Sequence, residues 1–247
     1  MTTNAPRRTL ALIALGLVAS VTLAARQTAA PPPGATPAER VAALKQSLQE
    51  SQKQLRLYEW AEATTISLKG EEKARKQQRC YYGADGKLQK VPIEGAPAAP
   101  PAEPEQGGRR GGRVKQAVIE NKKDDMKDYM EQATALIQRY VPPDPEDIQR
   151  AKPKAKVESP APGQARVTFT DYLLSGDRMT VNVDAAANRP LGISVASYLK
   201  KKEDTVTLDV KFSALPDGTI YVFETVLEAK AKNIRVVIQN TGHRLAK

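Results

Sequence analysis

The residue types that most often carry catalysis are nearly missing from this chain of 247 residues. It has one histidine, His243, and one cysteine, Cys80. A Ser-His-Asp or Cys-His site needs a histidine next to the nucleophile, and the only candidate lies close to the C-terminus. A single cysteine forms no internal disulfide, zinc cluster or redox pair. These counts argue against nucleophilic catalysis and against thiol chemistry.

Carboxylates are plentiful, but their spacing does not suit a metal site or an acid–base pair. Asp124 and Asp125 are neighbours on a predicted helix, where adjacent side chains point about 100° apart. Asp144 and Asp147 stand where a short helix is expected to begin, a usual place for acidic residues. The sequence has no EF-hand loop, H-E-x-x-H, G-x-S-x-G or P-loop motif. We therefore predict no metal, no cofactor and no enzyme activity.

The first thirty residues have the pattern of an export signal. Arg7 and Arg8 precede an uncharged apolar stretch over 10–25, and Arg26 ends it. This stretch is shorter than the ~20 residues that a membrane-spanning helix needs. A charged start, an apolar middle and a small-residue exit are typical of a secretory signal peptide. The alternative is an uncleaved N-terminal anchor.

Cleavage between Ala24 and Ala30 would leave one domain over 31–247. Without its first thirty residues the chain has 35 basic and 28 acidic residues, a net charge of +7 instead of +10. The lack of paired cysteines is compatible with an oxidising compartment, and we expect the periplasm.

Two helices are predicted from spacing and capping. The first begins near Pro37, since Thr36 and Glu39 form a capping box, and it runs to the mid-50s. The second runs from about Val114 to Tyr140. Its apolar positions recur at helical spacing: Met126, Tyr129, Met130, Ala133, Ile137 and Tyr140.

An aromatic hairpin follows the first helix. Alternation from Tyr58 to Lys69 predicts a strand, and the run from Glu71 to Tyr82 predicts its return. A turn at Asp85-Gly86 leads to a third strand over 87–93. The hairpin holds the only tryptophan, Trp60, and the only cysteine, which alternation directs to the apolar face as a small buried hydrophobe.

The last third of the chain alternates apolar and polar residues in six segments separated by short turns. "TVTLDVKF" (205–212) is the clearest of them, and "LPDG" (215–218) is a turn led by proline. Short turns favour antiparallel neighbours. The order predicts an α+β fold: a curved antiparallel sheet of about nine strands, a half-barrel, covered by two main helices.

The segment over 94–112, "EGAPAAPPAEPEQGGRRGG", is too poor in apolar residues to pack, and we expect a disordered loop. Its basic end, Arg109, Arg110 and Arg113, resembles arginine-glycine segments that bind nucleic acid. Aromatic residues are missing from it and an exported protein meets no RNA, so nucleic acid is not the expected partner. Contact with an anionic membrane surface or another polyanion is the remaining alternative to a solvated loop.

Two stretches resemble a known family. "YYGADGKLQK" (81–90) and "RMTVNVDAAANRPLGISVASYLKKKEDTVTLDVKFSALPDGTIYV" (178–222) are similar to the early aromatic hairpin and the later strands of the bacterial outer-membrane lipoprotein-carrier superfamily (LolA/LolB-like). The phrases "YEWAE" (58–62) and "LPDGTIYV" (215–222) are also similar to those of exported bacterial proteins without an assigned activity. The resemblance implies an open half-barrel, helices across its mouth, and a cavity suited to acyl chains. It assigns no individual binding residue.

Two functions follow from these expectations. The first is an exported carrier that binds an apolar or amphiphilic ligand, such as a lipid or a lipoprotein acyl chain, between sheet and helices. Its predicted cavity lining is Tyr58, Trp60, Ile66, Leu68, Cys80, Tyr82, Met126 and Met130. The second is a non-enzymatic envelope interaction or structural protein in which the same residues form a filled core. A connected apolar void beside Trp60 would favour the carrier, and tight packing there would favour the interaction protein.

Overall fold

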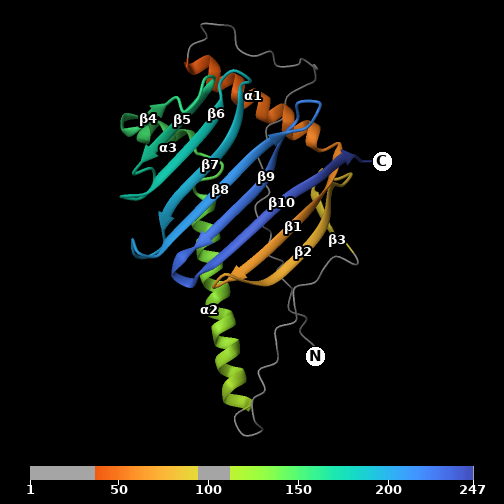
Figure 1. Ribbon diagram of the computed structural model, residues 1–247, viewed down its shortest axis with the longest axis vertical. Coiled ribbons are helices and arrows are strands. Elements are labelled where there is room, and N and C mark those ends of the chain that lie inside the picture. The colour runs from red at the N-terminus through yellow and green to blue at the C-terminus, as the bar shows by residue number, and fades with distance from the viewer. Residues whose placement is uncertain (1–36, 94–111, 247) are drawn as a thin grey trace.

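The computed structural model describes residues 37–93 and 112–246, which contain one ten-stranded antiparallel sheet and three α-helices (Figure 1). The elements are α1 (Pro37–Leu55), β1 (Tyr58–Leu68), β2 (Glu71–Tyr82), β3 (Leu88–Pro92), α2 (Gly112–Gln138), α3 (Pro145–Ala151), β4 (Lys156–Glu158), β5 (Gln164–Thr170), β6 (Arg178–Asp184), β7 (Arg189–Tyr198), β8 (Thr205–Ala214), β9 (Ile220–Ala229) and β10 (Ile234–Leu245). The α+β class and the antiparallel sheet are confirmed.

The sheet joins the two ends of the described chain. Strand order is β3-β2-β1-β10-β9-β8-β7-β6-β5-β4, so the first strand pairs with the last. From β4 to β10 each strand pairs with the next one in sequence, as short turns favour. The sheet is open, with β3 and β4 at its edges. Register shifts in four strand pairs (β1–β10, β1–β2, β6–β7 and β8–β9) add local bends of the kind that curve a sheet.

The sequence predicts about nine strands, and the tenth is a very short one at the edge of the sheet. Lys156–Glu158 pairs with β5, with Val157 opposite Val167. The three residues of this strand, which lies between Pro153 and Pro160, are too few to show an alternation of apolar and polar residues in the sequence. An ion pair between Lys156 and Glu158, 2.7 Å, accompanies this short edge strand.

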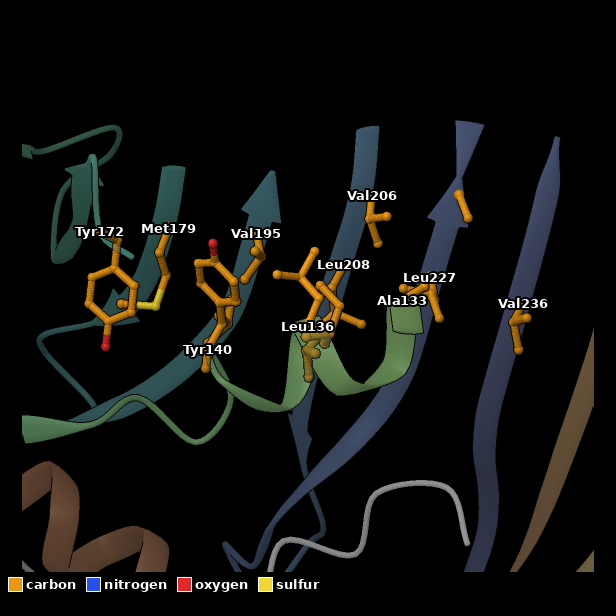
Figure 2. Packing of buried hydrophobic residues seen from close by; sticks show 14 of the residues in the cluster. Ala133, Leu136, Tyr140, Tyr172, Met179, Val195, Val206, Leu208, Leu227 and Val236 are labelled. Atoms are coloured by element: carbon orange, nitrogen blue, oxygen red, sulfur yellow. The ribbon is translucent and has the colours of Figure 1, made fainter. Parts of the chain in front are cut away.

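The core lies between α2 and one face of the sheet, which we call the inner face. Figure 2 shows Ala133, Leu136 and Tyr140 packed against side chains of β7, β8 and β9, with Val236 of β10 to one side. Tyr129, Ala133, Ile137 and Tyr140 are buried, which confirms the predicted apolar face of this helix. The helix ends at Gln138, two residues earlier than expected, and Tyr140 lies in the turn that precedes Pro142.

Helix α1 begins and ends where the sequence predicts, and it crosses the end of the sheet at which β9 begins (Figure 1). The hydroxyl of Ser51 accepts a hydrogen bond from the backbone N–H of Ile220, 3.0 Å. Both residues are buried. This contact satisfies a strand N–H at the start of β9 and fixes the helix over it.

A buried carboxylate ties the end of α2 to the sheet. Asp177 accepts hydrogen bonds from the Tyr140 hydroxyl (2.5 Å) and from the backbone N–H groups of Tyr172 (2.5 Å), Leu173 (2.9 Å) and Leu174 (2.7 Å). The Tyr140 hydroxyl also lies 2.7 Å from the hydroxyl of Ser197 on β7. These donors satisfy the hydrogen-bonding capacity of a carboxylate that is buried.

This network predicts a large effect of removing one oxygen atom. Tyr140→Phe removes one of the four donors to Asp177 and the side-chain partner of Ser197, and it should lower the free energy of unfolding by about 2 kcal/mol. Tyr198→Phe removes the same atom from an exposed hydrogen bond to the Ser175 carbonyl, and should cost under about 1 kcal/mol. Urea denaturation of both variants tests this. Equal effects would contradict the role given to the buried carboxylate.

Candidate functional site

The predicted lining residues of the aromatic hairpin share the inner face. Trp60 stands opposite Cys80, Ile66 opposite Val236, and Leu68 opposite Ile234. Val236 and Ile234 belong to the buried core, which identifies the face. Residues directly opposite on antiparallel strands point to the same side, so the alternation predicted for β1 and β2 is the observed one.

The apolar part of the inner face continues beyond α2, where its side chains become more exposed. Val236 is 6% exposed, whereas Ile66 directly opposite is 39% exposed. Leu68, Ile238, Met126 and Met130 pack against the core and are only partly buried. We call these five residues the open strip: Ile66, Leu68, Ile238, Met126 and Met130. Three of them come from β1 and β10, and the two methionines from α2.

An aromatic cluster lies further along β1. The Trp60 ring stacks on His243 with centroids 5.5 Å apart and lies 6.1 Å from Tyr82. Its Nε1–H donates to the side-chain oxygen of Asn240 (3.0 Å), whose amide donates to the Val222 carbonyl (2.9 Å). Trp60 is therefore held by packing and by a hydrogen bond.

His243 belongs to this cluster, which the sequence interpretation missed. It was taken as an isolated residue near the C-terminus, but its ring lies 4.1 Å from that of Tyr221 and stacks on Trp60. The register between β1 and β10 shifts opposite Trp60, and Gly242 there has φ +65°. A glycine inside an alternating strand is the signal that marks such a bulge.

Tyr58 takes a different position from the other predicted lining residues. Its hydroxyl donates to the carboxylate of Asp217, 2.6 Å away, in the turn between β8 and β9. This hydrogen bond, with the nearby charge, raises the pKa of Tyr58. Tyr58 therefore connects β1 to that turn.

Between the open strip and the aromatic cluster the inner face is polar. Lys90 on β3 donates to both oxygens of Glu62 on β1, 2.7 and 2.6 Å. The two side chains are 26% and 11% exposed. Gln78 on β2, opposite Glu62, is also buried. A partly buried ion pair persists because each charge has its partner.

Cys80 is fully buried beside this polar group. Burial raises the pKa of its thiol to about 11, and the Glu62 carboxylate adds to the increase. A thiol that stays protonated and out of contact with water is a poor nucleophile.

The two pockets described for this structure lie elsewhere, and none of the predicted lining residues borders them. The larger, about 580 Å³, is a groove on the outer face over β5 to β10. Its charges neutralise one another: Lys211 pairs with Glu224 (2.8 Å) and Arg235 with Glu228 (3.4 Å). The groove passes over Gly192, where a Cβ would stand 2.9 Å from the Val210 carbonyl oxygen.

The structure accounts for the acidic residues that the sequence analysis considered as possible site residues. Asp144 caps α3, accepting from the N–H groups of Glu146 (2.7 Å) and Asp147 (3.3 Å). Asp125 is exposed on α2. Within residues 37–93 and 112–246, no group of three or more His, Cys, Asp or Glu side chains is placed to hold a metal ion.

The basic residues Arg109 and Arg110 lie outside the described residues, as do the predicted signal peptide and almost all of the expected loop over 94–112. Gly112, the last residue of that loop, is the first of α2, and Arg113 follows it in the helix. In the described part of the chain no helix is long and apolar enough to cross a membrane.

Comparisons with known proteins give matches in structure only. No family model matches the sequence, and the search of curated proteins found no match. Two crystal structures match most of the chain. One is a DUF1329 family protein from Desulfovibrio piger, with 12% identity, TM-score 0.33, and coverage of 82% of this chain and 92% of the other. The second is a LolA superfamily protein from Nitrosomonas europaea, with 10% identity, TM-score 0.33, and coverage of 83% and 94%.

The aromatic cluster predicts a pH effect. Burial lowers the pKa of His243 from 6.5 to about 4, so the folded protein holds this ring neutral. Its contribution to stability is complete above pH 6.5 and should be lost as the pH falls towards 4, because the unfolded chain binds the proton first.

The single histidine makes this measurable by NMR, as a ring titration that occurs well below pH 6. In the matched variant His243→Gln, the part of the stability loss that occurs between pH 6.5 and 4 should be smaller. A ring that titrates near 6.5 in the folded protein would show that the cluster does not bury it.

Proposed function

We propose that this protein binds an apolar or amphiphilic ligand, such as a lipid or a lipoprotein acyl chain, on the inner face of its sheet. The observation that carries the proposal is the exposure of Ile66, 39%, directly opposite the buried Val236. An apolar row that continues from the core into solvent is a ready surface for an acyl chain. The proposed site is the open strip, and the aromatic cluster lies beyond the ion pair of Glu62 and Lys90.

The composition of the inner face supports an amphiphile over a purely apolar ligand. The open strip is apolar, and the ion pair of Glu62 with Lys90 lies next along β1. Lys76, exposed on β2, stands opposite Thr64 on the same face. An acyl chain along Ile66 and Leu68 would place a polar head group near these charges, where its hydrogen bonds are satisfied.

The cellular setting belongs to the same proposal. A signal peptide over 1–30 would deliver the domain to the periplasm, where lipids and lipoproteins must cross an aqueous space. Shielding an acyl chain from water gains about 0.8 kcal/mol for each buried CH₂ group. Sequestration would be the whole mechanism, and no covalent step is involved.

A matched pair of variants tests the site. Ile66→Asp places a charge on the open strip and should weaken binding of a fluorescent fatty acid at least about tenfold. Val157→Asp makes the same change on the edge strand β4, where the side chain is 69% exposed, and should leave binding unchanged. Circular dichroism checks that both variants fold. Equal affinities of Ile66→Asp and the unmodified protein would remove the open strip as the site.

The bound molecule can be sought directly. Protein purified from its own cell envelope is examined by native mass spectrometry, and its organic extract is analysed for lipid. Lipid that co-purifies supports the carrier. Repeatedly empty protein that also takes up no fluorescent fatty acid would refute it.

The second candidate function, an envelope interaction or structural protein, has one observation in its favour. Trp60 is held by Asn240, His243 and Tyr82, and neither described pocket borders it. In such a protein the aromatic cluster is filled core, and partners bind at exposed apolar residues of the edges, such as Val91 on β3, Ile93 just after it, or Val157 on β4. Empty preparations together with a co-purifying protein would decide for this function.

A further inference from the structure

Four hairpin turns meet at one end of the sheet. In an antiparallel meander alternate turns share an end, and here the turns β1–β2, β9–β10, β7–β8 and β5–β6 follow one another along it. We call this end the lysine rim. It is opposite the end crossed by α1 (Figure 1). A backbone hydrogen bond from the Lys69 N–H to the Asn233 carbonyl, 2.8 Å, joins the first two turns.

The lysine rim is rich in exposed cations. Its turns carry six exposed lysines: Lys69, Lys200, Lys201, Lys202, Lys230 and Lys232. They also carry four acids, three of which have partners. Asp171 pairs with Lys154 (2.7 Å), and Asp204 accepts from the Tyr129 hydroxyl. Asp177 is the buried carboxylate of the core, which leaves Glu203.

The opposite end of the sheet differs in charge. Its turns, over 83–87, 185–188 and 215–219, hold one lysine, Lys87, and two acids, Asp85 and Asp217. Clustering on a single rim is a stronger signal than the net charge of the chain, because the potential at a surface is set by charges within about one Debye length, ~8 Å in physiological salt.

The rim also has a cationic notch. A pocket of about 300 Å³ lies between the turns β1–β2 and β9–β10, and Lys69, Lys230 and Arg235 border it. Ser67 and Asn233 provide hydrogen-bonding groups there, and Glu228 is paired with Arg235. Both turns have a residue with positive φ, Lys69 and Asn233, at the notch. The notch is large enough for a phosphate group with part of its ester.

We infer that the lysine rim docks on an anionic lipid surface, with the notch receiving one phosphate head group. Lysines are mobile point charges that suit a fluid surface of head groups. The rim presents them side by side over several strands, and the one aromatic residue in its turns, Tyr172, is buried and so cannot stack on nucleobases. Helix α2 extends past this same end (Figure 1), so a surface that meets the rim also meets the helix. The inference does not depend on the proposed ligand binding.

Sedimentation with vesicles tests the docking. The purified protein should sediment with vesicles of phosphatidylglycerol and phosphatidylcholine, stay in solution with phosphatidylcholine alone, and be released by high salt. The combined substitutions Lys200→Gln, Lys201→Gln and Lys202→Gln should weaken binding about 100-fold, since each lysine near an anionic membrane contributes about 1 kcal/mol.

The control removes three cations from the other end of the molecule: Lys53→Gln, Arg56→Gln and Lys87→Gln, all exposed. It should bind vesicles as the unmodified protein does. Equal losses in both triple variants would mean attraction by net charge alone, and would overturn the inference. So would a failure of the unmodified protein to sediment, or stronger binding to duplex DNA than to vesicles. Uptake of fluorescent fatty acid, measured in the same variants, reports separately on the open strip and should be unchanged.

Discussion

The width of the sheet constrains the rest of the molecule. Ten strands spaced about 4.8 Å apart make a surface about 43 Å across, whereas a helix with its side chains covers about 10–12 Å. Helix α2 covers the middle of the inner face, and the buried residues from Met179 to Val236 mark its reach. Helix α1 crosses one end. These two helices therefore cannot cover the whole inner face. The uncovered part must carry polar residues, be covered by its own large side chains, or remain exposed to solvent.

All three solutions occur along β1. Glu62, with Lys90, makes the face polar. Trp60 covers the neighbouring part with its own ring, which is large enough to pack against His243 and Tyr82 and polar enough to bond Asn240. Ile66 stays open. If β1 carried only apolar residues on the inner face, it would expose a patch prone to self-association. The observed order of residues along β1 confines the exposed apolar surface to the part nearest the core.

Local pattern predicted most of the elements, because capping and alternation act within a few residues. The bounds of α1 and β1 are cases where a cap, a proline or a two-residue turn stands at each end. What the sequence missed depends on contacts beyond those few residues. Strand β4 exists through its partner β5, and the place of His243 follows from the bulge that sets it against Trp60. The buried role of Asp177 needs Tyr140, 37 residues away, and a carboxylate at the end of a turn gives no sign of it.

The open strip ends at the lysine rim, so the two proposed surfaces are continuous. Leu68, the last residue of β1, is followed directly by Lys69. The residue paired with Leu68 on β10 is Ile234, which directly follows Asn233 at the notch. The apolar end of the strip therefore meets the rim, while the ion pair of Glu62 and Lys90 lies further along the strand. A lipid that entered from a bilayer at the rim would lay its acyl chain on Leu68 and Ile66, and its head group would reach the paired charges without displacing them. In the reverse arrangement, with the polar group at the rim, an acyl chain would have to cross the ion pair before it reached any apolar contact.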